Sequence, residues 1–340
     1  MNRIALDLAS LLLLTASVIS CGPVSESGAL GRPDLSPPTH LETRTLDEGV
    51  LEIVFDEPAS LDTDGLVIDP LLAVLSTEER ENSVLLRLDG QEPGARYTLR
   101  CVVSDGRGNT MSIVTTFYGH NPDLPLMRIN EFTPRGSGNH PDALEILVMR
   151  GGNMGGAVLY QGTRNEWRDR LVFPAFAVED GDFVVVHFKP EGIPEESDET
   201  TSKSASGGRD ASDTAFDFWL TDSSGISGNN GVLTLYEKPG GDIIDGVLYS
   251  NRTSDSDERY LGFGTREVML WALELAGDGG WVVENRKVRP EDGVNPEGST
   301  GTRSICRAAG EDTDTRRDWH IVPTRQASFG RENSQEVYIP

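Results

Sequence analysis

Glu131 and Glu145 are the side chains in this sequence that could most readily perform catalysis as a pair. Most glycosidases use two carboxyl groups, one as a general acid and the other as a nucleophile or base. Such a site needs its acids clustered in a deep pocket, with raised pKa values. An enzyme with a carboxylate site of this kind is therefore one hypothesis for the chain.

The histidines indicate neither a metal centre nor a general base. The five lie at positions 40, 120, 140, 187 and 320, and none belongs to an HxxxH pair of the zinc type. His187 shares one face of a predicted strand with Phe183 and Val185, so we interpret it as a packed or hydrogen-bonded residue. His140 precedes a proline in a loop, where we expect it to contact solvent. The sequence also lacks the C-x-x-C, Walker, G-x-S-x-G and G-x-G-x-x-G motifs. We therefore predict no catalytic residue, no cofactor site and no metal site.

Two acidic runs match cation sites only in part. Asp62 and Asp64 lie within residues 60–71, but Leu71 stands where a calcium loop needs its bidentate glutamate. Residues 312–315 repeat Asp-Thr, and such side chains usually cap loops through hydrogen bonds to the backbone. We expect a turn in the first case and a loop cap in the second.

The charge balance excludes some classes of partner. The chain has 30 Lys and Arg against 55 Asp and Glu, which gives a formal net charge of −25. Nucleic acids and anionic lipid headgroups need basic surfaces, so we expect neither as a partner. Cationic partners are compatible with this charge, although solubility is the simpler interpretation of an acidic surface.

A thiol near the N-terminus predicts a covalent modification. Residues 8–19 form an apolar run that is shorter than the roughly 20 residues of a membrane span but suits the core of a signal peptide. Ser20 and Cys21 follow it, and residues 18–21 resemble a bacterial lipobox. The resemblance implies a signal peptide at residues 1–20, cleavage before Cys21 and attachment of lipid to the Cys21 sulfur. The alternative is an ordinary secretory signal cut near residues 15–17.

Acylation of Cys21 would make the membrane a partner of this chain. Two or three acyl chains anchor a protein stably, since each buried methylene adds roughly 0.8 kcal/mol and one chain alone is marginal. Residues 21–36 would then be the lipidated cysteine and a flexible tether, because this segment is rich in Gly, Pro and Ser and has no periodicity. We expect a location in the cell envelope, at the outer membrane or on the periplasmic face.

The segment beyond the tether, residues 37–119, is predicted to consist of short strands. Apolar side chains alternate there with period two between turn residues, as in half-buried strands. The alternating residues are Leu51, Ile53 and Phe55; Val84, Leu86 and Leu88; Tyr97, Leu99, Cys101 and Val103; and Met111, Ile113, Thr115 and Phe117. Tyr97, Leu99, Asp105, Gly108 and Asn109 are similar to the closing motif of bacterial Ig-like domains. The resemblance implies a β-sandwich that acts as a spacer or an adhesion module.

Strands are also predicted in the C-terminal two thirds of the chain, at residues 127–131, 143–149, 183–188, 232–236 and 243–249. Several ordered motifs accompany these strands: residues 129–131, 144–146, 172–174, 180–186, 229–235, 244–249, 304–307, 312–315, 318–319 and 329–333. In this order they resemble a lamin-tail domain, an Ig-like sandwich of nuclear lamins and of secreted bacterial proteins. The resemblance covers residues 127–337 and implies that Glu131 and Glu145 have a structural role.

Two insertions and a linker complete the predicted organisation. Residues 189–215 are acidic and rich in Ser and Gly, which predicts a disordered loop. Residues 251–303 contain a helical apolar pattern at 268–275 that ends at Gly277, and we expect this helix to cover one end of the sandwich. Prolines in residues 120–126 predict a linker. The predicted fold class is all-β, with two Ig-like β-sandwich domains in tandem, the second with an inserted loop and a short helix.

The remaining cysteines, Cys101 and Cys306, fall in different predicted domains. Cys101 lies on the apolar face of its strand, where a free cysteine acts as a small hydrophobic residue. A disulfide between the two would tie the domains together, but buried thiols in separate cores rarely meet. We expect both to be free.

These features predict a membrane-anchored, non-catalytic envelope lipoprotein that serves as a binding, adhesion or scaffold module. Its expected ligand is a protein or a glycan that the sequence does not identify. One alternative is an accessory lipoprotein that binds substrate for a hydrolase on another chain. The other is the enzyme with a carboxylate site.

Replacing Cys21 by alanine is expected to release the protein from membranes, because no apolar run after residue 20 approaches the length of a membrane span. Detergent phase partitioning of the wild type and the Cys21→Ala variant measures this. Ser20→Ala keeps the thiol and a small residue before it, so this control should partition like the wild type. A Cys21→Ala protein that still enters the detergent phase would show that the lipobox interpretation is wrong.

Overall fold

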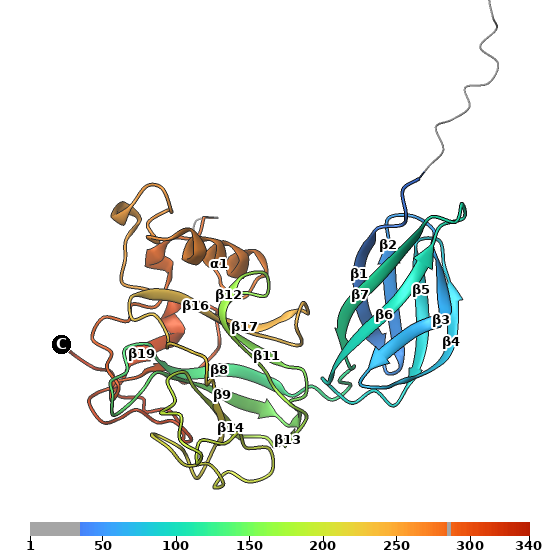
Figure 1. The fold of residues 1–340 in the computed structure, drawn as a ribbon. Helices are drawn as coiled ribbons and strands as arrows, with labels where there is room; N and C mark the ends of the chain where they lie inside the picture. Colours follow the sequence, from blue (N-terminus) through green and yellow to red (C-terminus); the bar gives the residue numbers. More distant parts are fainter. Residues whose placement is uncertain (1–34, 284–286) are drawn as a thin grey trace, which may run out of the picture. The chain divides into compact units, whose positions relative to one another are not determined.

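The computed structural model describes residues 35–283 and 287–340. The predicted signal peptide, Cys21 and nearly all of the predicted tether therefore lie outside the described residues. Within these ranges the chain is all-β, with strands arranged in several sheets and a single α-helix (Figure 1). No helix in this part of the chain is long and apolar enough to cross a membrane.

The first sandwich, residues 40–118, consists of two antiparallel sheets. One sheet has the strand order β1-β2-β5-β4 and comprises β1 (His40–Asp47), β2 (Val50–Phe55), β5 (Ser83–Asp89) and β4 (Ala73–Glu79). The other has the order β3-β6-β7 and comprises β3 (Ser60–Asp69), β6 (Arg96–Ser104) and β7 (Thr110–Tyr118). No strand of these two sheets pairs with a described strand after residue 125.

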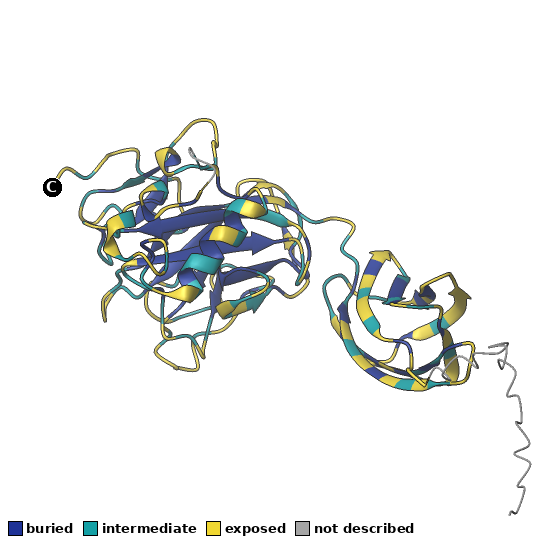
Figure 2. Cartoon of the chain, turned by 90° about the horizontal axis from the view of Figure 1, so that it is seen from above, coloured by how far each residue is buried: buried dark blue, intermediate teal, exposed yellow. Residues whose placement is uncertain are grey.

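The core of the first sandwich forms from the side chains that alternate in the sequence. Leu51, Ile53 and Phe55 of β2 are buried, as are the alternate apolar residues of β5 and β6. The rings of Tyr97 and Phe117 stack with their centroids 5.2 Å apart. Figure 2 shows the resulting alternation of buried and exposed positions along these strands.

A side-chain cap explains the motif that closes this sandwich. Between β6 and β7, Asp105 Oδ1 accepts hydrogen bonds from the backbone amides of Arg107 and Asn109, each at 2.8 Å. Its Oδ2 accepts a third from Asn109 Nδ2 at 2.7 Å. Gly108 has φ +88°, a left-handed conformation that favours glycine. These residue types therefore fix the turn of a hairpin.

The second sandwich, residues 126–340, is built from a six-stranded and a four-stranded sheet that share one core. The six-stranded sheet has the order β15-β14-β9-β8-β18-β19 and comprises β15 (Phe216–Trp219), β14 (Phe183–His187), β9 (Ala143–Arg150), β8 (Leu126–Thr133), β18 (Ile305–Arg307) and β19 (Trp319–Ile321). The four-stranded sheet has the order β12-β11-β16-β17 and comprises β12 (Trp167–Val172), β11 (Val158–Gly162), β16 (Asn230–Tyr236) and β17 (Ile243–Ser250). Two short strands, β10 (Gly152–Asn153) and β13 (Ala177–Val178), pair separately.

The insertion at residues 189–215 connects two parallel strands, β14 and β15. Parallel neighbours need a long crossover, because the chain must return to the end of the sheet from which it started. The segment has no strand or helix, but the prediction of disorder is wrong. Glu199 is buried, and its carboxylate accepts hydrogen bonds from the backbone amides of Ala205, Ser206 and Asp217. Glu196 likewise accepts hydrogen bonds from the backbone amides of Glu191, Gly192 and Ile193, so acidic side chains of the loop itself organise it.

The predicted helix is present as α1 (Arg266–Gly277), and it begins where Thr265 Oγ1 accepts a hydrogen bond from the Val268 amide. It does not cover an end of the sandwich as predicted. It packs on β16 and β17 of the four-stranded sheet. A Cβ atom on Gly246 would lie 2.4 Å from the Leu275 side chain, so a glycine in β17 allows the helix to approach the sheet.

Both cysteines among the described residues are free and buried, each in its own sandwich. Cys101 belongs to the core of the first sandwich, and burial raises the pKa of its thiol to about 11. Cys306 lies on β18, next to Ser304 and Ser328. The structure therefore places no disulfide between them.

Candidate functional site

The two acids that could have formed a catalytic pair lie opposite each other on adjacent strands. Glu131 of β8 is in register with Glu145 of β9. A β-bulge between Ile129 and Glu131 gives β8 an extra residue, so that Asn130 and Glu131 both lie away from the core. Ile129 and Phe132 on either side belong to that core. Both carboxylates are completely buried.

The C-terminal segment, residues 325–333, covers the carboxylates of Glu131 and Glu145. Ser328 donates two hydrogen bonds to Glu131, from its backbone amide at 2.8 Å and from its hydroxyl at 2.7 Å. The Gly330 amide donates to Glu145 Oε2, and Asn130 Nδ2 donates to Glu145 Oε1 at 2.7 Å. Each carboxylate is therefore used to bind a backbone segment, and neither faces solvent.

Asn333 fastens the far end of the same segment. Its Nδ2 donates to the carbonyl oxygens of Arg307, at 2.9 Å, and of Asn130, at 3.1 Å. Its Oδ1 accepts a hydrogen bond from Asn130 Nδ2 at 2.9 Å. Residues of the C-terminal motif therefore form hydrogen bonds with residues of the β8 and β9 motifs, and the three motifs belong to one contact in the folded chain.

The environment of the pair raises both pKa values. Burial raises the pKa of Glu131 against the lowering effect of its hydrogen bonds to serine. Burial, followed by repulsion from the charge of Glu131, raises the pKa of Glu145 well above its usual range. Raised pKa values often mark catalytic acids, but here they accompany complete burial under a bound segment. The structure therefore favours the structural interpretation of the pair.

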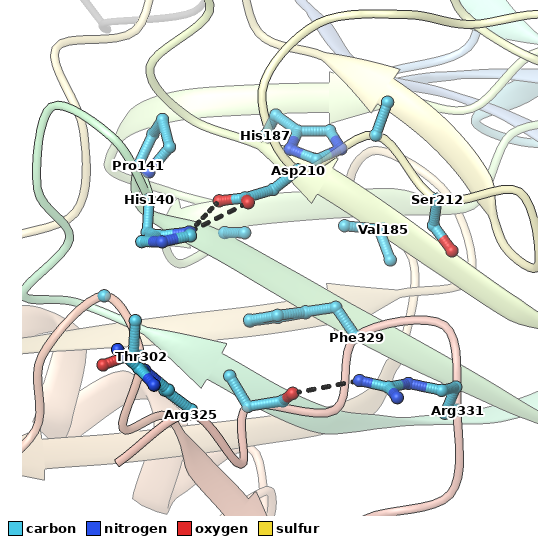
Figure 3. A pocket seen from close by; sticks show the side chains of 14 residues that line it. His140, Pro141, Val185, His187, Asp210, Ser212, Thr302, Arg325, Phe329 and Arg331 are labelled. Atoms are coloured by element: carbon cyan, nitrogen blue, oxygen red, sulfur yellow. Dashed lines mark hydrogen bonds and ion pairs between the residues drawn. The ribbon is translucent and has the colours of Figure 1, made fainter.

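A pocket of about 470 Å³ lies beside the C-terminal segment, on the side of the six-stranded sheet that faces away from the core. Its apolar surface is formed by Ala143, Val185 and Phe329, which pack together outside the main core. The labelled residues around it are His140, Pro141, Val185, His187, Asp210, Ser212, Thr302, Arg325, Phe329 and Arg331 (Figure 3). This pocket is the candidate functional site.

His187 forms part of the pocket and is held from two sides. Its Nε2 lies 2.8 Å from Asp217 Oδ1, and its ring stacks on Trp219 with centroids 3.9 Å apart. The Ser212 amide donates to the other oxygen of Asp217 at 2.7 Å. The prediction of a packed, hydrogen-bonded histidine is confirmed. The sequence did not indicate that Asp217 is the partner of His187. Asp217 lies on β15, and only the parallel pairing of β15 with β14 brings the two side chains together.

His140 stands at the opposite edge of the pocket and pairs with Asp210. Its Nδ1 lies 3.0 Å from Asp210 Oδ1, and its side chain is 45% exposed, so it contacts solvent as predicted. Asp210 comes from the insertion at residues 189–215. It is the one acid among the described residues that line the pocket, and it has a histidine partner. The lining therefore lacks the carboxylate pair of a glycosidase.

Two arginines from the C-terminal segment complete the pocket. Arg325 and Arg331 lie on either side of Phe329 in Figure 3. Arg325 has φ +68°, an uncommon left-handed conformation for a non-glycine residue, and its amide donates to the Thr302 carbonyl at 2.8 Å. A binding role for these arginines could not be predicted, although Arg331 lies in the motif at residues 329–333, since only the folded segment brings both to one pocket.

The acidic cluster near residues 312–315 lies outside this pocket, and the guanidinium group of Arg307 pairs with it. Carboxylate oxygens of Asp245, Asp312 and Asp314 lie within 4.8 Å of one another. Arg307 forms an ion pair with Asp245 at 2.8 Å and a second with Asp312. Burial raises the pKa of Asp245 to about 6, against the lowering effect of the Arg307 charge. The guanidinium supplies the counter-charge, so we assign this cluster to the fold.

Comparison with known proteins shows similarity to a family of domains and to a bacterial protein. The family model TP_1001_2nd, described as "protein second domain", matches residues 125–321. An uncharacterized protein of Treponema pallidum (strain Nichols) is 28% identical over 158 residues, which is 46% of this chain and 40% of that protein. The chain thus spans less than half the length of this relative. The family match includes Glu131 and Glu145 and ends before Ser328.

Replacing Glu145 by glutamine is expected to reduce the pH dependence of stability. A carboxyl group whose pKa is raised by folding keeps its proton at pH values where the unfolded chain has released it. Its contribution to the free energy of unfolding is therefore complete below the unfolded pKa, here 4.5. That contribution falls as the pH rises toward the folded pKa, by up to about 1.4 kcal/mol per pH unit for one proton. Glutamine does not ionise and removes this loss.

Urea unfolding of the wild type and of Glu145→Gln, at several pH values upward from 4.5, measures the effect. Glu258→Gln is the matched control, because Glu258 is exposed and should leave the pH dependence unchanged. If Glu145→Gln and the wild type lose stability with pH at the same rate, the raised pKa of Glu145 is contradicted.

Proposed function

The chain belongs to the TP_1001_2nd family, and from this premise we propose that it is a lipid-anchored envelope protein whose second sandwich binds a ligand without catalysing its reaction. The observation that carries the proposal is the division of roles within the second sandwich. The buried acids Glu131 and Glu145 bind the C-terminal segment, while the open pocket beside that segment has the lining of a binding site.

The pocket supports a binding function through its size and its mixed lining. Ligand sites are commonly clefts of about 300–1,000 Å³ with an apolar surface and a few fixed polar groups. This pocket has an apolar part at Val185 and Phe329, and its polar groups include the His140–Asp210 pair. Its histidines are each held by an aspartate, which restricts their orientation.

The buried carboxylates argue against the hypothesis of a glycosidase. General acid catalysis requires the acid to reach the scissile bond directly or through one water molecule. Glu131 and Glu145 are fully buried and hydrogen-bonded to Ser328 and Gly330. A substrate could reach them only after the C-terminal segment had left the sheet.

The proposed anchor and the proposed domain types rest on the sequence. Acylation of Cys21 would tether the chain to a membrane, with residues 22–36 as a spacer. We propose that the first sandwich is a bacterial Ig-like spacer and that the second is a lamin-tail-like binding domain. In that arrangement the acylated Cys21 keeps the protein at the membrane, and the pocket of the second sandwich binds the ligand.

Filling the pocket is expected to abolish ligand binding while the fold remains intact. Ala211 lines the pocket from a loop and is half-buried, so an Ala211→Trp side chain can occupy the cavity without entering the core. The measurement is saturation-transfer NMR with small molecules extracted from cell envelopes, using full-length protein in mild detergent. Wild-type protein should show bound ligands that Ala211→Trp lacks, with equal thermal unfolding temperatures.

Ala73→Trp, at an exposed position of the first sandwich, is the control and should bind as the wild type does. Equal binding by wild type and Ala211→Trp would contradict the proposal that this pocket is the site. Chemical conversion of a bound ligand by purified protein would contradict its non-catalytic part.

A further inference from the structure

Building on the proposed function, we propose that the pocket beside the C-terminal segment binds a small monocarboxylate, with the guanidinium groups of Arg325 and Arg331 providing positive charge for the carboxylate and Phe329 contacting an apolar body.

The two arginines are free of ion pairs within the described part of the chain. Arg331 donates one long hydrogen bond, 3.4 Å, to the Ala327 carbonyl, and Arg325 forms no side-chain bond to a described residue. Neither arginine forms an ion pair with a described carboxylate, although the charge of Arg331 has a lowering effect on the pKa of the buried Glu145. Two such guanidinium groups at one pocket point to an anionic ligand.

The segment that carries the arginines is fixed before any ligand binds. Ser328 and Gly330 lie between Arg325 and Arg331, and both are bound to buried carboxylates of the sheet. The left-handed backbone of Arg325 is held by its hydrogen bond to the Thr302 carbonyl. Backbone strain of this kind concentrates at binding sites, and a fixed segment reduces the entropy lost on binding.

The rest of the pocket defines the body of the ligand. Phe329 and Val185 pack against each other and offer an apolar surface next to the arginines. Figure 3 shows the His140–Asp210 pair across the pocket from Arg325 and Arg331. Because Phe329 lies between the two arginines in Figure 3, a ligand whose carboxylate contacts a guanidinium group can place an apolar part against Phe329 and direct a polar group toward the His140–Asp210 pair.

Electrostatics favours a single negative charge over two. Guanidinium groups bind carboxylate and phosphate alike, through paired hydrogen bonds. The lining contains two guanidinium groups and one carboxylate, that of Asp210, so a single negative charge on the ligand balances the charged side chains and a second would exceed them. A monocarboxylate is therefore favoured over a ligand with two negative charges.

Calorimetric titration of the full-length protein in mild detergent tests the proposal with matched probes. Phenylacetate and glucuronate are the carboxylates, phenylacetamide and glucose their neutral counterparts, and phenyl phosphate the dianion. We expect at least one carboxylate to bind roughly tenfold or more tightly than its neutral counterpart, since charge-assisted hydrogen bonds are worth about 1.5–3 kcal/mol. Phenyl phosphate should bind more weakly than phenylacetate.

Variants then separate the ligand class from the location of the site. Arg325→Gln and Arg331→Gln should each weaken carboxylate binding about tenfold or more. Arg266→Gln, an exposed arginine at the start of α1, is the control and should have no effect. Thermal unfolding temperatures confirm that each variant folds.

Three outcomes overturn the inference, and they differ in what they leave standing. Carboxylate binding that Ala211→Trp abolishes but both arginine variants retain would refute the role of the arginines and leave the pocket as a ligand site. Equal binding of carboxylates and neutral counterparts would refute the ligand class alone. Carboxylate binding that survives in Ala211→Trp would place the site elsewhere and refute the proposed function as well.

Discussion

Two carboxylates buried in the six-stranded sheet fix the position of a segment almost two hundred residues away in the sequence. Glu131 and Ser328 are 197 positions apart, yet they form two hydrogen bonds to each other. Burying a carboxyl group without hydrogen-bond partners is unfavourable, and the backbone amides of Ser328 and Gly330 provide those partners. One wall of the candidate pocket follows from this contact, because Arg325, Phe329 and Arg331 occupy the same segment.

Much of the fold could be predicted from the sequence, because half-buried strands leave a period of two. The alternating faces of β2, β5 and β6 are buried where that period placed them. The helical pattern became α1, although its position on the sheet could not be foreseen, since Gly246 shows its packing role only once β17 is paired. Short strands such as β15, β18 and β19 were missed, because four or three residues hold too little pattern.

The site was harder to predict than the fold, since its parts meet only through long-range pairing. The sequence drew attention to Glu131 and Glu145, but whether they catalyse or support the fold depends on the segment that covers them. Arg325 belongs to no motif or periodic pattern, and Arg331 lies in the motif at residues 329–333, which indicated a fold and no binding role. The same holds for the partners of the histidines: Asp217 reaches His187 through a parallel strand pair, and Asp210 reaches His140 from a loop predicted to be disordered.

Hydrogen exchange at the backbone amides of Ser328 and Gly330 tests the central claim most directly. If buried carboxylates hold the C-terminal segment on the sheet, both amides should be protected to the level of the paired amides in β8 and β9, because they open only when that sheet opens. Exchange of these two amides at the rate of an unstructured peptide, while β8 and β9 stay protected, would contradict the account.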